Sequence, residues 1–295
     1  MHNFRESGRR ISPRFKSILW VSGAAFVVLY FAVPAALLRW GLDRVIFRAQ
    51  SNDRTHEDQR FDVAVSPGAT VVVRRYGGAG QACAFFFPGQ HGGIGTYEGT
   101  LFPLIRAAGA DVYAISYPGQ DGAKGHAHVA SLFDQVALAV SQVGKATHCG
   151  MRRSVFVGRS LGATVALAEA VKFKPRGVLV DSLGADLSGV IRAWISRHPM
   201  LVGWQMLPVR GLLGQRDYPA ASLLEQAPSV PVSVFQGMAD TVTPYVLARN
   251  ATQGHSNVIF TTVVGGTHQD TYRLAGDAYA GSLRSLLDAD ASRSR

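Results

Sequence analysis

Short apolar runs alternate with segments of helical length along most of this 295-residue chain, and this alternation constrains the fold more than any other feature. The runs are continuously apolar, which is typical of strands buried on both faces of a sheet. Strands that alternate with helices form βαβ units, so the sequence predicts an α/β fold with a mostly parallel sheet and helices on both faces. We expect eight strands, the first two antiparallel, over 61–65, 70–76, 82–87, 111–117, 154–157, 177–180, 230–235 and 258–264. Helices are expected over 96–108, 128–143, 161–173, 245–251 and 271–287.

The N-terminal region contains an uncharged stretch of 22 residues, Ser17 to Leu38. At about 1.5 Å per residue, a helix of this length reaches roughly 33 Å, enough to cross the ~30 Å hydrocarbon core of a bilayer. We therefore expect a single transmembrane anchor, with Trp20 and Trp40 near its two ends. A signal peptide cleaved near residue 36 is the alternative, because Val33-Pro34-Ala35 offers small residues near a cut. The predicted division of the chain is a basic N-terminus (1–16), the anchor (17–38), a juxtamembrane linker (39–59) and a folded domain (60–290).

The net charge of +10, from 30 Lys and Arg against 20 Asp and Glu, belongs mainly to this N-terminal region. Residues 1–50 hold eight basic and two acidic side chains, a net of +6, which leaves 22 basic and 18 acidic side chains, or +4, for the rest. The sequence of the folded domain contains no basic cluster of the kind that binds nucleic acid. We therefore expect no nucleic acid as a partner. Five basic residues precede the span and three follow it, so the positive-inside rule predicts a cytoplasmic N-terminus and a periplasmic or luminal domain.

The segment 182–228 is far longer than one crossover helix between two strands requires, and it is rich in large apolar residues. A long insertion of this kind is usually functional, and the sequence predicts a lid over a site. An extra pair of helices that only pack is the alternative.

A candidate nucleophile, Ser160, stands in the sequence VFVGRSLGA, where a strand is followed by G-x-S-x-G and then a helix. A serine on such a tight turn takes a strained backbone conformation that lifts its Oγ off the sheet edge. Gly158 and Gly162 suit this turn, because a Cβ at either position would meet the neighbouring strand or helix. The helix N-terminus also directs free N–H groups toward any oxyanion that forms there.

A serine hydroxyl becomes a good nucleophile when a histidine takes its proton and a carboxylate orients that histidine. In this topology both partners follow the serine, each in a loop after the C-terminal end of a strand. Asp240 and His268 stand in two such loops, so we predict a Ser160, His268 and Asp240 triad. Asp181, at the end of an earlier strand, is the second candidate for the acid.

The loop after the third strand, FPGQHGG, is the expected source of one oxyanion donor, since its glycines let the backbone approach a substrate closely. The backbone N–H groups of Gln90 and Leu161 are the predicted pair. His91 lies close to the site but before the serine, and we interpret it as a residue that lines the pocket. The phosphate-binding pattern G-x-x-x-x-G-K-[ST] does not occur in this loop.

Residues from about 60 to 290 resemble the α/β-hydrolase superfamily, and within it the single-pass membrane hydrolases of the Bem46 and ABHD12/ABHD13 kind. The resemblance is carried by FFFPGQHGG, ISYPGQDGAKG, VGRSLGA, PVSVFQGMADTVTP and VGGTH, in that order. It implies the α/β-hydrolase fold and places the nucleophile, acid and base of the family on Ser160, Asp240 and His268. The chain departs from the family at two places, with Pro88-Gly89 and Gln236-Gly237 where relatives usually carry His-Gly.

Cys83 and Cys149 are too few for a disulfide framework and lack the spacing of a metal site, so free, buried thiols are the first interpretation. The resemblance makes the third and fifth strands neighbours, which brings the two cysteines to the same end of the sheet. A disulfide is then an open alternative if the domain lies outside the cytoplasm, although the offset along the chain could separate the Cα atoms by more than ~7 Å.

The sequence therefore predicts a membrane-anchored serine hydrolase that cleaves an ester, thioester or amide through an acyl-enzyme. A lipid or acyl ester is favoured as the small-molecule substrate, and no metal or organic cofactor is implied. The alternatives are a catalytically silent domain that acts as a membrane-tethered binding module, and an acyltransferase that uses the same triad.

Overall fold

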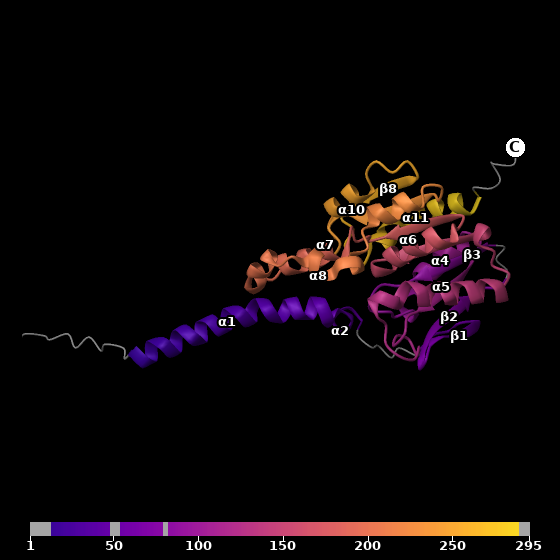
Figure 1. Cartoon of the computed structure of the whole chain (residues 1–295). Helices are drawn as coiled ribbons and strands as arrows, with labels where there is room; N and C mark the ends of the chain where they lie inside the picture. Colours follow the sequence, from indigo (N-terminus) through magenta and orange to yellow (C-terminus); the bar gives the residue numbers. More distant parts are fainter. Residues whose placement is uncertain (1–12, 48–53, 79–81, 289–295) are drawn as a thin grey trace, which may run out of the picture.

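The computed structural model describes residues 13–47, 54–78 and 82–288, and its core is one eight-stranded sheet (Figure 1). The strand order is β1-β2-β4-β3-β5-β6-β7-β8. β1 and β2 are antiparallel to each other, β2 is antiparallel to β4, and the remaining pairs are parallel. The strands are β1 Gln59–Ser66, β2 Ala69–Tyr76, β3 Ala82–Phe87, β4 Ala110–Ser116, β5 Ser154–Arg159, β6 Gly177–Asp181, β7 Val232–Gly237 and β8 Val258–Val263. The predicted eight strands, the mostly parallel sheet and the antiparallel first pair are confirmed.

Helices cover both faces of the sheet, as its continuously apolar strands require. Successive residues of β3 separate the two layers: Phe85 and Phe87 pack with α5 and α6, whereas Phe86 packs with α3, α4 and α11. These helices are α3 Gly95–Glu98, α4 Leu101–Ala107, α5 Val129–Ala146, α6 Leu161–Phe173 and α11 Thr271–Asp288. α9 Ala220–Gln226 and α10 Tyr245–Thr252 lie toward the last strands, and the 3-10 helix η1 Met151–Arg153 precedes β5.

The helix predicted over 96–108 is two helices, α3 and α4, with Gly99 and Thr100 between them. Pro103 explains the break, because proline lacks an N–H and its ring clashes with the carbonyl four residues earlier. In α4 it lies in the first turn, where neither effect disrupts a helical hydrogen bond.

The N-terminal helix α1 Pro13–Trp40 projects from the body of the molecule (Figure 1). Its stretch Trp20–Trp40 has a mean hydropathy of 2.2 and is long and apolar enough to cross a membrane. Side chains 20–29 are exposed, whereas Tyr30, Phe31, Pro34, Ala35 and Leu38 are partly or fully buried. The C-terminal half of α1 therefore packs on the protein along one face of the helix.

The segment predicted as a juxtamembrane linker, 39–59, is in part folded onto the domain. Residues Leu42–Ile46 form helix α2, and Leu42 and Ile46 are buried in an apolar cluster with Val129. The Asp43 carboxylate accepts hydrogen bonds from the Val129 backbone N–H (2.8 Å) and the His128 ring Nδ1 (2.9 Å). The connection after α1 is thus in part a helix docked at the start of α5.

Cys83 and Cys149 are joined in a disulfide, so the interpretation as free thiols is wrong. Cys83 pairs with Ser154 in the ladder between β3 and β5, five residues beyond Cys149. Helix η1 shortens the path between Cys149 and Ser154, because a 3-10 helix rises only ~2.0 Å per residue. The two cysteine Cα atoms consequently lie 5.9 Å apart, within the range of a disulfide.

We expect no free thiol when the protein is denatured without reductant and its thiols are counted, and two after reduction. The double variant Cys83→Ser/Cys149→Ser should lower the free energy of unfolding by about 2 to 4 kcal/mol, since the disulfide closes a long loop in the unfolded chain. Denaturant titration measures this change. Two free thiols in the unreduced protein would contradict the disulfide.

Candidate active site

Ser160 occupies a strained turn between β5 and α6, with φ 55° and ψ −121°. A non-glycine residue takes such angles only where its surroundings enforce them. A Cβ on Gly158 would lie 2.8 Å from the Ala163 Cα, and one on Gly162 would overlap the Phe87 carbonyl oxygen. The two glycines therefore let α6 pack directly against β5 and β3, which holds the turn with the serine at its tip, as the sequence predicts.

The structure brings Ser160, His268 and Asp240 together from three loops at one edge of the sheet. The His268 Nε2 lies 3.0 Å from the Ser160 Oγ, and its Nδ1 lies 2.9 Å from an Asp240 carboxylate oxygen. A carboxylate can only accept, so Nδ1–H donates to Asp240 and leaves Nε2 free to accept from the serine hydroxyl. This is the tautomer that lets a histidine remove a proton from a serine.

The Asp240 carboxylate is buried and fully engaged by its own loop. One oxygen accepts from the Val242 and Thr243 backbone N–H groups at 2.8 Å each, and the other accepts from the Thr243 hydroxyl at 2.6 Å. Burial by itself would raise the pKa of Asp240, but the hydrogen bonds from His268 and Thr243 outweigh it and hold the pKa below its ordinary value. Asp240 is therefore ionised at neutral pH and can stabilise a protonated His268.

Gln236 fixes the loop that carries Asp240, a role that we did not predict. Its side chain is fully buried, its amide nitrogen donates to the Thr243 carbonyl at 2.7 Å, and its amide oxygen accepts from the Leu183 N–H at 2.9 Å. A buried polar residue directly before Gly237 was the only signal of this role in the sequence.

The predicted oxyanion loop passes beside the nucleophile. A Cβ on Gly89 would lie 3.4 Å from the Ser160 Cβ, which places the Gly89-Gln90 peptide next to the serine, while Leu161 begins α6. The side chains after β4 hold this loop from behind: the Tyr117 hydroxyl donates to the Pro88 carbonyl (3.0 Å) and the Gln120 amide to the Gln90 carbonyl (2.6 Å). The His91 ring lies 3.2 Å from the Gln90 side chain, so it contacts the loop at the edge of the site.

Asp181, the second candidate for the acid, points to a different partner. Its carboxylate is fully buried and forms an ion pair with Arg159, with the Arg159 Nε 3.0 Å from one oxygen. The Arg159 guanidinium also donates to the His268 carbonyl and lies 5.0 Å from the centre of the Tyr272 ring. Arg159 thus connects the turn of Ser160 to the loop of His268, and Asp181 fixes Arg159 rather than the histidine ring.

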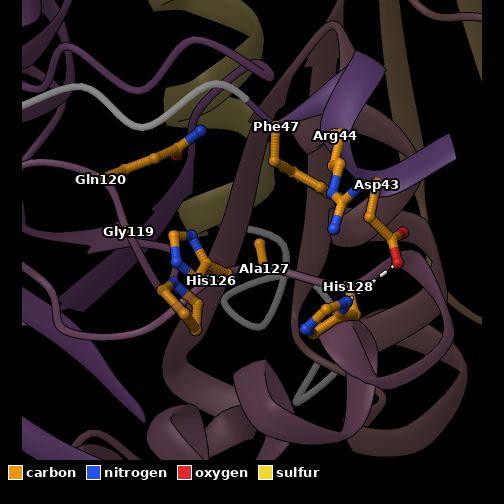
Figure 2. A pocket seen from close by; sticks show the side chains of 9 residues that line it. Asp43, Arg44, Phe47, Gly119, Gln120, His126, Ala127 and His128 are labelled. Atoms are coloured by element: carbon orange, nitrogen blue, oxygen red, sulfur yellow. Dashed lines mark hydrogen bonds and ion pairs between the residues drawn. The ribbon is translucent and has the colours of Figure 1, made fainter. Parts of the chain in front are cut away.

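A cavity of about 270 Å³ lies beyond the oxyanion loop, between α2 and the segment that follows β4. Figure 2 shows Asp43 and Arg44 of α2 on one side and His126 and His128 on the other. Gln120, which donates to the Gln90 carbonyl, also lines it. In the part of the chain that the structure describes, no group of three or more His, Cys, Asp or Glu side chains is arranged to hold a metal ion.

The model of a protein family described as the alpha/beta hydrolase family matches residues 84–288. Among solved structures, an esterase of Pyrococcus furiosus superposes with a TM-score of 0.67 at 12% identity, covering 82% of this chain and 98% of its own. An esterase of Rhodococcus sp. ECU1013 gives a TM-score of 0.59 at 14% identity, covering 78% and 98%. A hydrolase of Pseudomonas aeruginosa PA01 gives 0.58 at 17% identity, covering 79% and 99%. No curated protein sequence matches the chain significantly.

A matched pair of variants distinguishes the role of the Asp240 carboxylate from that of Asp181. Asp240→Asn should lower kcat on p-nitrophenyl acetate by about ten-thousand-fold with little loss of stability, because the histidine loses the acceptor that fixes its tautomer. Asp181→Asn should leave Arg159 buried without its counter-charge and lower the free energy of unfolding by about 3 to 5 kcal/mol, with a much smaller loss of kcat. Steady-state kinetics and denaturant titration measure both. The reverse pattern would assign the acid to Asp181.

Proposed function

The chain belongs to the alpha/beta hydrolase family, and we propose that it is a membrane-anchored serine esterase with Ser160, His268 and Asp240 as its triad. The observation that carries this proposal is the continuous series of hydrogen bonds from the Ser160 Oγ through His268 to Asp240. The strained backbone of Ser160 supports it, since such strain is maintained where it positions a reacting group.

The proposed reaction is acyl transfer through a covalent intermediate. The Ser160 Oγ attacks the carbonyl carbon of the ester while its proton passes to the His268 Nε2, and the Gln90 and Leu161 N–H groups stabilise the oxyanion. The carbon–oxygen bond to the leaving alcohol then breaks as His268 returns the proton to it. Water attacks the acyl-enzyme by the same route and releases the acid.

An ester of a lipid or another long acyl group is the proposed substrate class. The similar structures include two described as esterases, and the insertion beside the site is apolar. The motifs shared with the Bem46 and ABHD12/ABHD13 kind, together with the apolar N-terminal helix, support membership of that membrane-bound group.

The proposal includes retention of α1 as a membrane anchor. Its buried face, from Tyr30 to Leu38, packs against the insertion, and cleavage near residue 36 would remove most of this packing. The basic residues before α1 favour a cytoplasmic N-terminus. The disulfide favours an oxidising compartment for the domain, which agrees with that orientation.

A fluorophosphonate probe tests the enzyme directly, because it reacts with an activated serine. The wild-type chain should be labelled at Ser160 and Ser160→Ala should not. The full chain in detergent is the right material, because truncation at residue 50 would remove the buried Leu42 and Ile46. A folded wild-type protein that resists the probe would favour the silent binding module, and transfer of the acyl group to an added alcohol in preference to water would favour the acyltransferase.

Orientation can be tested with a reporter that is active only outside the cytoplasm, fused to the C-terminus. We expect full reporter activity and a protein that stays with the membrane after alkaline carbonate extraction. A silent reporter on a membrane-bound protein would show that the orientation is the opposite of the one proposed. Release of the protein by carbonate would contradict the proposal that α1 is a membrane anchor.

A further inference from the structure

The insertion between β6 and β7 forms an arm that lies alongside the anchor helix (Figure 1). This arm, residues 187–213, consists of α7 Leu187–Ser196, the 3-10 helix η2 Pro199–Met206 and α8 Val209–Leu213. A short 3-10 helix, η3 Gly214–Asp217, follows it. The Tyr30 hydroxyl of α1 donates to the Met200 carbonyl at 2.8 Å, and the Tyr30 and Trp204 rings lie 5.9 Å apart. The far end of the arm therefore contacts α1 at Tyr30.

The position of Tyr30 in α1 fixes how deep the arm reaches. Tyr30 lies eight residues before Leu38, the end of the uncharged stretch Ser17–Leu38 that is nearer to the hydrolase domain. Eight helical residues correspond to about 12 Å, less than half of the ~30 Å hydrocarbon core. If α1 crosses a bilayer, η2 lies inside the hydrocarbon core, in the half nearer to the hydrolase domain.

The outer surface of η2 exposes several large apolar side chains. Met200, Val202 and Met206 are 88%, 69% and 82% exposed, and they follow one another within seven residues. Exposed apolar side chains gathered in this way mark a surface for a protein or a membrane.

Several polar groups of the arm are paired within it, and the exposed Arg197, directly after α7, donates to the Thr241 hydroxyl. The Arg192 guanidinium donates to the Gln205 and Leu207 carbonyls, and the Gln205 amide donates back to the Arg192 carbonyl. His198 donates from Nδ1 to the Trp194 carbonyl at 2.7 Å. Polar groups in or near hydrocarbon must be hydrogen-bonded within the protein, because no water is available there. Among the described side chains of η2, the buried Trp204 indole N–H is the one without a hydrogen-bond partner.

The same apolar packing continues from the arm to the nucleophile. Leu207, Val209 and Leu213 of the arm form one cluster with Leu42 and Ile46 of α2, and Leu161, directly after Ser160, packs against it. The cavity of Figure 2 lies beside α2, beyond the end of α1. Buried apolar side chains thus connect the arm to Leu161, the residue next to Ser160.

We propose that residues 187–213 are inserted in the bilayer beside α1, with the acyl chains of the leaflet covering Met200, Val202 and Met206. This arrangement gives Ser160 access to acyl esters dissolved in that leaflet. The proposal rests on the anchored esterase proposed above and adds the membrane leaflet as the place from which the substrate comes.

Depth is measured with a fluorophore on a single introduced cysteine in the full chain. The two native cysteines are joined, so the introduced one is the only free thiol. The chain is reconstituted in phosphatidylcholine vesicles, and its fluorescence is quenched either by lipid with a nitroxide near the end of the acyl chain or by aqueous iodide. Met200→Cys should be quenched by the nitroxide and protected from iodide, as should Val27→Cys, an exposed position on α1.

The matched control is Ile259→Cys, an apolar residue 70% exposed at the start of β8, at the sheet edge opposite Ser160. It should be quenched by iodide alone. Iodide quenching at Met200 with nitroxide quenching at Val27 would overturn the proposal while leaving the anchor intact. Protection of Met200 from both quenchers would also overturn it and indicate a second copy over the arm. Iodide quenching at Val27 would show that α1 does not cross the membrane, which would contradict the anchor as well.

A second measurement uses the double variant Met200→Asp/Met206→Asp, with Ile259→Asp as control. Hydrolysis of a water-soluble p-nitrophenyl ester should be unchanged, whereas hydrolysis of an ester embedded in vesicles should fall about ten-fold or more, since carboxylates are costly in hydrocarbon. An equal effect on both esters would overturn the proposal. If the wild-type chain cleaves neither ester, the proposed esterase function is wrong. The depth measurement then still decides whether the arm is inserted.

Discussion

The strained turn at Ser160 is the constraint on which the rest of the site depends. Its backbone is tolerated because Gly158 and Gly162 let α6 approach β5 and β3 to a distance that no side chain would allow. Strain of this kind costs on the order of 1 to 3 kcal/mol, and the packing of β5 and α6 in the core offsets it. The turn places the Ser160 Oγ within hydrogen-bond reach of His268, whose other ring nitrogen contacts Asp240.

Two sets of contacts bring the other loops to that turn. On one side, the Tyr117 hydroxyl donates to the Pro88 carbonyl and the Gln120 amide donates to the Gln90 carbonyl. On the other, Arg159 joins the buried Asp181 to the backbone of the His268 loop. A buried ion pair contributes little stability by itself, but breaking it leaves an unpaired charge, so such a pair holds its surroundings in one arrangement. The Arg159 pair therefore has a positioning role that is separate from the Asp240 contact.

The helices α1 and α2 pack on the insertion and on α5 through both apolar and polar contacts. Apolar side chains from Phe31 to Leu38 join α1 to the insertion, and the Tyr30 hydroxyl donates to the Met200 carbonyl. Asp43 of α2 binds the start of α5. A single apolar cluster connects these elements to Leu161. The helix proposed as an anchor is consequently part of the environment of the site, and its removal would uncover that cluster.

The sheet, the order of its strands and helices along the chain, and three residues that meet in one site could all be predicted from the sequence. These depend on local signals: continuous apolar runs, the glycines around Ser160, and the positions of Asp240 and His268 after strand ends, where parallel strands share one edge. The tertiary structure decided the partner of Asp181, the role of Gln236, the disulfide between Cys83 and Cys149, and the docking of α1 and α2. Each of these depends on distances between segments that are far apart in the chain or on a local departure from extended backbone, as in η1. Periodicity encodes which face of an element is buried, whereas strand register and the packing of whole elements decide which side chains touch.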